Sequence, residues 1–106
     1  MSMVELLGAK DEQLAAFCRK WEVAEMALFG SVLREDFDLE SDVDVLVEFS
    51  PGARRTLFDL ARMEEQLGGI FGRKVDLVEK GAVERSDNYI RRRRILSSAR
   101  VVYAAR

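Results

Sequence analysis

The sequence contains no histidine and only one cysteine, Cys18. Without histidine the chain cannot form a Ser-His-Asp triad, an HExxH zinc site or an imidazole general base. A single cysteine likewise excludes an internal disulfide. Any chemistry must therefore depend on carboxylates, arginines, lysines, hydroxyls and a bound metal. Carboxylate oxygens favour hard cations such as Mg²⁺.

Long hydrophobic runs are also missing. The most apolar stretches, such as "VDVLVEF", are too short to cross a bilayer, and the N-terminal "MSMVELLGAK" lacks the charged start and apolar segment of a signal peptide. We therefore expect a cytoplasmic protein that does not enter a membrane. The length of 106 residues suits one domain over residues 1–106, and 48% hydrophobic with 34% charged residues predicts that it folds.

The charges are distributed unevenly along the chain. Residues 1–50 carry 4 Lys/Arg and 12 Asp/Glu, whereas residues 51–106 carry 13 Lys/Arg and 7 Asp/Glu. An acidic half beside a basic half suits a site in which carboxylates hold a metal and arginines hold an anionic ligand.

Hydrophobic periodicity predicts alternating helices and strands. Thr56 and Asp59 form a capping box before a helix whose apolar stripe runs from Leu57 to Phe71 and is broken near Gly68-Gly69. In chain order we expect a helix over 10–22, a strand over 25–30, a short helix over 31–37, a strand over 42–49, the capped helix, a strand over 73–80, a helix over 83–98 and a strand over 99–104. This order predicts an α/β (α+β) fold with a small mixed sheet of about four strands and helices packed on it.

Two carboxylates interrupt the clearest strand, "DVDVLVEF". Since side chains alternate along a strand, Asp42 and Asp44 face the same way, with Cα atoms about 6.5–7 Å apart. Such a pair can share one cation or flank two. Asp76 adds a third carboxylate within "KVDLV", and all three converge if the two strands are neighbours. The valines at 43, 45 and 47 then face a helix on the other side.

Gly30 and Ser31 complement the carboxylates. A glycine at the end of a strand lets the backbone approach a ligand closely, and the free N–H groups of a helix opened by Ser31 favour phosphate. Arg34, one turn later, can reach the same anion with its planar guanidinium. Each feature alone has a plainer interpretation: a turn for Gly30-Ser31, a solvated edge strand for the aspartate pair, and a surface residue for Asp76. Their combination favours a functional site.

Gly30-Ser31, ten further residues and then Asp42-x-Asp44, with Asp76 on a later strand, resemble the nucleotidyltransferase superfamily of DNA polymerase β. The segments "FGSVLRED", "SDVDVLVEF" and "KVDLVEK" look most like its minimal nucleotidyltransferases (MNT). The resemblance implies a polymerase β-like fold that moves AMP from ATP, with Asp42, Asp44 and Asp76 holding about two Mg²⁺ ions. It implies that Gly30, Ser31 and Arg34 bind the nucleotide. Glu35 departs from the pattern, because many minimal members have glycine there.

The resemblance also implies a partner. Minimal members often act as the antitoxin of a toxin–antitoxin pair, and the expected acceptor is a tyrosine hydroxyl of a nearby-encoded HEPN-domain toxin, in a type VII-like system. Two alternatives stay open. The chain could neutralise or regulate its partner by binding alone, or it could transfer the nucleotidyl group to a small molecule.

Four consecutive arginines, Arg91 to Arg94, point around most of a helix circumference. A solvated helix end accounts for at least two of them, and the others could contact the triphosphate, RNA or an acidic partner. No aromatic residues interleave with them, so a stacking platform for single-stranded nucleic acid is not expected.

Overall fold

The computed structural model of this chain describes residues 9–30 and 42–105. The described elements are α2 (Asp11–Lys20), β1 (Val23–Phe29), β2 (Val43–Phe49), α3 (Leu57–Phe71), β3 (Val75–Glu79), α4 (Lys80–Glu84), α5 (Tyr89–Ser98) and β4 (Arg100–Ala104). The strands form one sheet in the order β3-β2-β1-β4. Among the described strands, only the pair β2 and β3 runs parallel. The predicted mixed four-stranded sheet is therefore confirmed.

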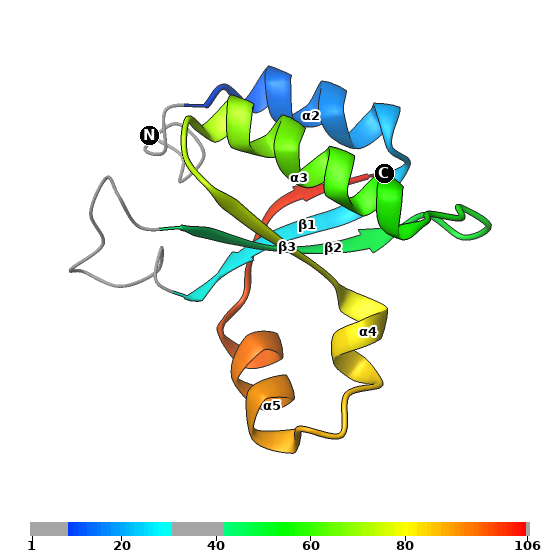
Figure 1. The fold of residues 1–106 in the computed structure, drawn as a ribbon, viewed down its shortest axis with the longest axis vertical. Coiled ribbons are helices and arrows are strands. Elements are labelled where there is room, and N and C mark those ends of the chain that lie inside the picture. The colour runs from blue at the N-terminus through cyan, green and yellow to red at the C-terminus, as the bar shows by residue number, and fades with distance from the viewer. Residues whose placement is uncertain (1–8, 31–41, 106) are drawn as a thin grey trace.

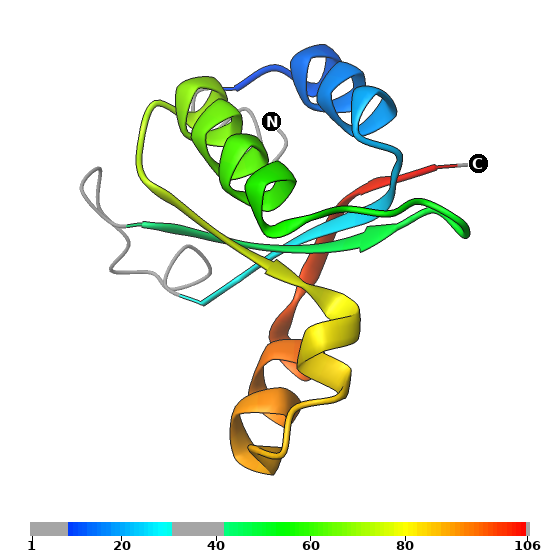
Figure 2. The same cartoon turned by 45° about the vertical axis from the view of Figure 1, so that its right-hand side comes forward.

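Helices cover both faces of this sheet, as Figure 1 and Figure 2 show. Helices α2 and α3 lie side by side on one face, and α4 and α5 lie on the other. The short helix expected over residues 31–37 lies outside the described residues. None of the described helices is both long and apolar enough to cross a membrane.

The larger apolar cluster lies between the sheet and the helices α2 and α3. Every second residue of β2, at 43, 45 and 47, is fully buried there, as the sequence predicts. These valines share the cluster with Met63 and Leu67 of α3. Phe17 and Cys18 of α2 and the following Trp21 also belong to it. Full burial of one valine or leucine contributes about 1.5–3 kcal/mol, so this layer supplies most of the apolar stabilisation.

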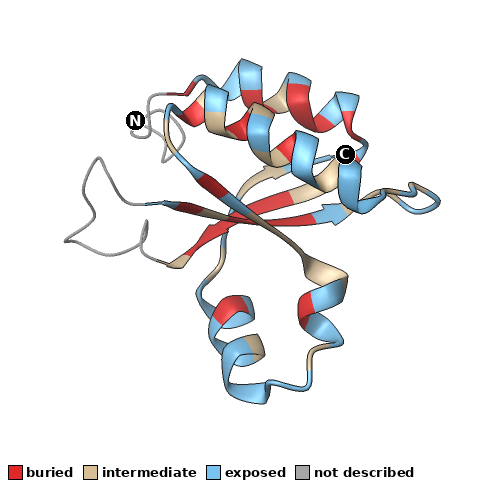
Figure 3. Ribbon diagram, in the orientation of Figure 1, coloured by how far each residue is buried: buried red, intermediate tan, exposed pale blue. Residues whose placement is uncertain are grey.

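A smaller apolar cluster lies on the opposite face of the sheet. Its buried members are Ala27 and Phe29 of β1, Leu46 of β2, Val83 of α4 and Ile95 of α5. Figure 3 shows that α4 and α5 otherwise expose most of their residues. The second helical layer is therefore attached to the sheet by few apolar side chains.

Helix α3 differs from its predicted form at both ends. Thr56 and Asp59 do form the capping box, with Thr56 Oγ1 accepting from the Asp59 N–H and the Asp59 carboxylate accepting from the Thr56 N–H. Leu57, however, is 84% exposed and does not join the buried stripe. The predicted break near Gly68-Gly69 is wrong, because the helix continues to Phe71 and ends at Gly72, whose φ is +69°. Burial of Leu67 and Phe71 outweighs the roughly 1 kcal/mol by which each glycine disfavours a helix.

The predicted single helix over residues 83–98 is also wrong. The chain forms α4, which includes Val83, and then α5, which begins at Tyr89. Asn88 caps α5, since its side-chain oxygen accepts a hydrogen bond from the Arg91 N–H at 3.1 Å. Asparagine favours such caps over helix interiors because its side chain competes for backbone hydrogen bonds.

Candidate active site

Asp44 and Asp76 lie next to each other in the sheet. They are Cα partners in the register of the parallel strands β2 and β3, and neighbouring strands are about 4.8 Å apart. Their sequence neighbours at 43, 45, 75 and 77 belong to or pack on the larger cluster. The two carboxylates therefore lie on the opposite face, the one that also carries α4 and α5.

Both carboxylates reach solvent. Asp76 is exposed and Asp44 is half-buried, and no charged residue in the described part of the chain is buried. Solvent access explains how an otherwise apolar strand accommodates aspartates, because neither carboxylate is removed completely from water.

Asp42 lies one residue before β2 begins and is exposed. Within residues 9–30 and 42–105, no three carboxylate, thiol or imidazole groups lie close enough together to hold a metal ion. The structure thus pairs Asp44 with Asp76 as the sequence predicts. The structure does not bring Asp42 into one group with them, and the shared role of the three carboxylates in holding metal stays a prediction.

Gly30 follows the last residue of β1 and lies directly against Asp44. Its φ of +77° lies in the left-handed region, and a Cβ atom built there would overlap the Asp44 carboxylate. The sequence argument assigned this glycine to a close approach between backbone and ligand. The structure adds that a side chain at position 30 would displace one of the candidate catalytic carboxylates.

The remaining predicted nucleotide-binding residues, Ser31 and Arg34, lie outside the described residues. Glu35, where many minimal nucleotidyltransferases have glycine, also lies outside the described residues. Their expected roles in phosphate binding therefore stay predictions.

The backbone of β3 is held from the side by α3. The Glu64 carboxylate of α3 accepts a hydrogen bond of 2.9 Å from the N–H of Leu77, the residue after Asp76. β3 is an edge strand, so this bond satisfies an N–H group that its one neighbouring strand does not. Glu64 therefore helps to fix Asp76 beside Asp44.

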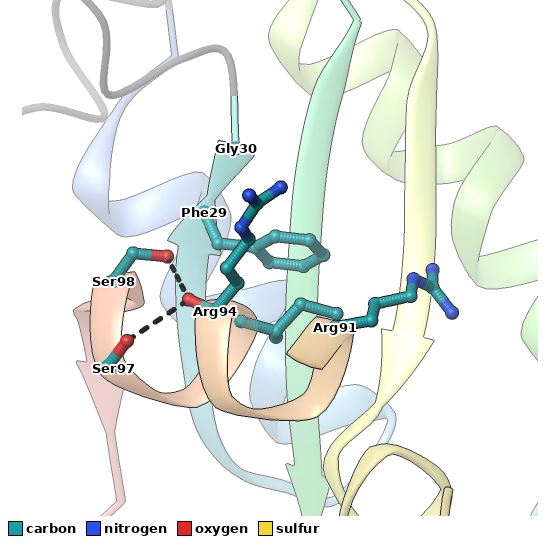
Figure 4. A pocket seen from close by; sticks show the side chains of 7 residues that line it. Phe29, Gly30, Arg91, Arg94, Ser97 and Ser98 are labelled. Carbon is teal, nitrogen blue, oxygen red and sulfur yellow. Dashed lines mark hydrogen bonds between the residues drawn. The ribbon is translucent and has the colours of Figure 1, made fainter. Parts of the chain in front are cut away.

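A cavity of about 460 Å³ opens beside Gly30, on the face that carries the carboxylates. Its lining comes from the end of β1 and from α5: Phe29, Gly30, Arg91, Arg94, Ile95, Ser97 and Ser98. Figure 4 shows Arg94 extending toward Gly30. The sequence argument left the role of the arginine run open. The only sequence signal for this cavity is the three-residue spacing of Arg91 and Arg94, which puts both on one face of α5.

Sequence comparison gives a family match over most of the chain. The profile of the nucleotidyltransferase domain family matches residues 10–102. A Methanocaldococcus jannaschii protein named "Putative protein adenylyltransferase" is 40% identical over 65 residues. The Thermococcus cleftensis protein adenylyltransferase MntA is 35% identical over 65 residues. Each alignment covers 61% of this chain and 64% of the relative.

Solved structures share the fold. One named "Structure of putative minimal nucleotidyltransferase" has a TM-score of 0.67 and 33% identity, covering 92% of this chain and 93% of that one. An antitoxin–toxin complex with AMP-PNP matches with a TM-score of 0.68 at 14% identity, covering 92% of this chain and 75% of the other. A Shewanella oneidensis MNT antitoxin in complex with a tri-AMPylated HEPN toxin gives 0.62 at 16% identity, covering 96% and 73%.

Proposed function

Because the chain belongs to the nucleotidyltransferase domain family, we propose that it transfers AMP from ATP to a tyrosine hydroxyl of a partner protein in the cytoplasm. The observation that carries the proposal is the pairing of Asp44 with Asp76 beside Gly30. The pairing puts two solvent-accessible carboxylates next to the end of β1. The curated relatives named protein adenylyltransferases support the choice of a protein acceptor.

The donor set fits Mg²⁺. Carboxylate oxygens are ligands that this cation prefers, and Asp44 and Asp76 leave room for water and phosphate oxygens in the remaining positions. Asp42, Asp44 and Asp76 would hold the metal. When bound, Mg²⁺ offsets negative charge on the attacking and leaving oxygens.

The protein's own residues bind the nucleotide and accept a proton. Gly30, Ser31 and Arg34 bind the phosphates, and Asp76 receives the proton of the attacking hydroxyl. The hydroxyl oxygen forms a bond to the α-phosphorus while the bond to the bridging oxygen breaks, and pyrophosphate leaves. Such transfers depend mainly on positioning and charge stabilisation, which suits a site built on adjacent strands.

We further propose that the acceptor is a HEPN-domain toxin and that modification silences it, so that the chain acts as a type VII-like antitoxin. Support comes from the fold neighbours, several of which were solved as toxin–antitoxin complexes. The partner would supply the acceptor surface.

The test is the intact mass of the adjacent-gene product after incubation with this protein, ATP and Mg²⁺. We expect the mass to rise by one or more AMP units. The change Asp42→Asn/Asp44→Asn should abolish the gain, and the matched control Asp87→Asn, an exposed aspartate between α4 and α5, should retain it. Omitting Mg²⁺ should also abolish the gain.

Two outcomes would replace the proposal. If the partner keeps its mass but still loses toxicity in the complex, and Asp42→Asn/Asp44→Asn neutralises equally well, the chain acts by binding alone. If a small molecule such as an aminoglycoside gains AMP without any partner protein, the acceptor is not a protein.

A further inference from the structure

The structure separates the four arginines of α5 into three environments. The Arg92 guanidinium contacts residues near its own helix. Its Nη1 donates a hydrogen bond to the Ser86 carbonyl at 2.9 Å, and its central carbon lies 5.3 Å from the Tyr89 ring centre. Arg93 is exposed and lines none of the described cavities. Arg91 and Arg94 line the cavity beside Gly30. The run therefore contains two arginines that line one cavity.

Arg91 and Arg94 belong to α5, which lies on the same face of the sheet as Asp44 and Asp76. Figure 4 shows Arg94 directed toward Gly30, while Arg91 extends along the same face. Arg91 also lines a smaller cavity of about 130 Å³ together with Val78, which follows Asp76 by two residues on β3. The two guanidinium groups thus lie on the side of the sheet that carries Asp44 and Asp76.

Within the described ranges, neither guanidinium forms an ion pair. The salt bridges found there join Arg55 to Glu22, Lys80 to Glu48 and Arg85 to Glu79. Two like charges one helical turn apart repel each other. An anion in the cavity would remove that repulsion and offer both forks a partner.

The chemistry of the site calls for additional positive charge. Three carboxylates and a triphosphate carry more negative charge than two divalent cations neutralise. Arginine matches phosphate oxygens with two parallel hydrogen bonds and does not lose its proton at neutral pH. The cavity is also of the size that holds small-molecule ligands.

We propose that Arg91 and Arg94 clamp the triphosphate of the bound nucleotide against Gly30, from the sheet face opposite α2 and α3. The inference rests on the proposed function, because it assigns a nucleoside triphosphate to the cavity. It adds α5 to the nucleotide-binding elements, although this helix lies after all three aspartates in the sequence. An acidic peptide is the weaker candidate, since it would bring a carboxylate beside Asp44 at the Gly30 wall without the Mg²⁺ that accompanies a nucleoside triphosphate.

The test is calorimetric titration of the whole chain with ATP and, separately, with tripolyphosphate, both in the presence of Mg²⁺. We expect Arg91→Gln/Arg94→Gln to raise the Kd for both ligands about tenfold or more. Arg93→Gln, in the same run but outside the cavity, should change neither Kd by more than about twofold. Arg91→Lys/Arg94→Lys should recover part of the affinity, because lysine keeps the charge without the planar fork. Thermal melts of each variant verify that it is folded.

The outcomes separate the clamp from the transferase activity. If the wild type binds ATP and Arg91→Gln/Arg94→Gln binds it equally well, the clamp is overturned and the proposed function stands. If the double variant weakens ATP binding but not tripolyphosphate binding, the arginines hold the nucleoside, and the phosphate clamp is again wrong. If the wild type binds neither ligand, both proposals fail. A third titration uses a single-stranded oligoribonucleotide. If Arg91→Gln/Arg94→Gln loses affinity for this RNA but binds ATP as the wild type does, the arginines bind RNA and the clamp is overturned.

Discussion

Gly30 and Asp44 share one small volume: a methyl group at position 30 would occupy space that the Asp44 carboxylate now fills. The glycine directly follows β1, and the aspartate is the second residue of β2. The antiparallel register, which pairs Phe29 with Asp44, brings them together. The position of a candidate catalytic carboxylate thus depends on the absence of a side chain on the neighbouring strand.

We expect Gly30→Ala to lower AMP transfer by about 100-fold, because small displacements of a reacting group have effects of that size. Its positive φ also predicts a loss of stability of about 1–2 kcal/mol. Gly52→Ala is the matched control, since Gly52 has a φ of +86° and no atom lies within 4 Å of the position that its Cβ would take. Both variants should show lower melting temperatures, but only Gly30→Ala should lose activity. Equal activity of the two variants would refute the steric argument.

Removal of the Glu64 carboxylate should disturb Asp76 through the backbone of β3. Glu64→Ala leaves the Leu77 N–H without its acceptor, and we expect a loss of about 1.5–3 kcal/mol in the free energy of unfolding. The control is Glu65→Ala, an exposed neighbour on the same helix, which should change stability by less than about 0.5 kcal/mol. Urea unfolding followed by the emission of Trp21 measures both variants. A retained kcat in folded Glu64→Ala would show that Glu64 does not position Asp76.

The capping box of α3 should make stability depend on acidic pH. The hydrogen bond from the Thr56 backbone N–H lowers the pKa of Asp59 below its ordinary value. A carboxyl group whose folded pKa is depressed stabilises the fold above its unfolded pKa, and the contribution is lost as the pH falls through the folded pKa. The melting temperature of Asp59→Asn should therefore lie below that of the wild type near neutral pH, and the two should converge in acid.

Two controls accompany the measurement on Asp59. Thr56→Ala removes the hydroxyl acceptor of the same box and should cost about 1 kcal/mol. Asp87→Asn removes an exposed carboxylate from outside α3 and should change stability by less than about 0.5 kcal/mol near neutral pH. A constant difference between Asp59→Asn and the wild type at all pH values would show that ionisation of Asp59 is not involved.

Cys18 should be unreactive until the protein unfolds. The side chain is fully buried, and this burial raises the pKa of the thiol to about 12 despite the opposing charge of Arg19. Because the thiolate is the reactive form, labelling by an aromatic disulfide at mildly alkaline pH should be at least about 100-fold slower in the native than in the unfolded chain. Cys18 is the sole cysteine, so the labelling rate reports one position in α2. Rapid labelling of the native protein would contradict its placement in the core.

The sequence predicts most of the fold because its strands and its first helix have clear periodicity. Valine alternation in β2 correctly identifies the buried face, and the Thr56–Asp59 pair correctly marks the start of α3. The errors occur where local signals are weak or compete with tertiary packing. Gly68 and Gly69 disfavour a helix locally, but burial of Leu67 and Phe71 maintains it. The arginine-rich segment has no apolar period, so the break between α4 and α5 depends on the cap at Asn88.

The candidate site is predictable in part. Strand alternation and the parallel pairing of β2 with β3 place Asp44 beside Asp76, as the sequence leads us to expect. The contact between Gly30 and Asp44 depends on the register of β1 against β2, which the local sequence does not specify. Likewise, the cavity at Arg94 depends on how α5 packs against the sheet. This is a tertiary arrangement, and a run of four identical residues gives no local signal for it.

The attachment of α4 and α5 has a consequence for turnover. The proposed clamp arginines lie on α5, which is held to the sheet through the smaller apolar cluster around Val83 and Ile95. Asp44 and Asp76, in contrast, belong to strands that pack on the larger apolar cluster. Elements with few apolar contacts open at a lower free energy than the core of a protein. Under the proposed function, we expect the α4–α5 layer to loosen when substrate enters or pyrophosphate leaves, while the carboxylates keep their mutual geometry. Amide exchange should be faster in α5 than in β2.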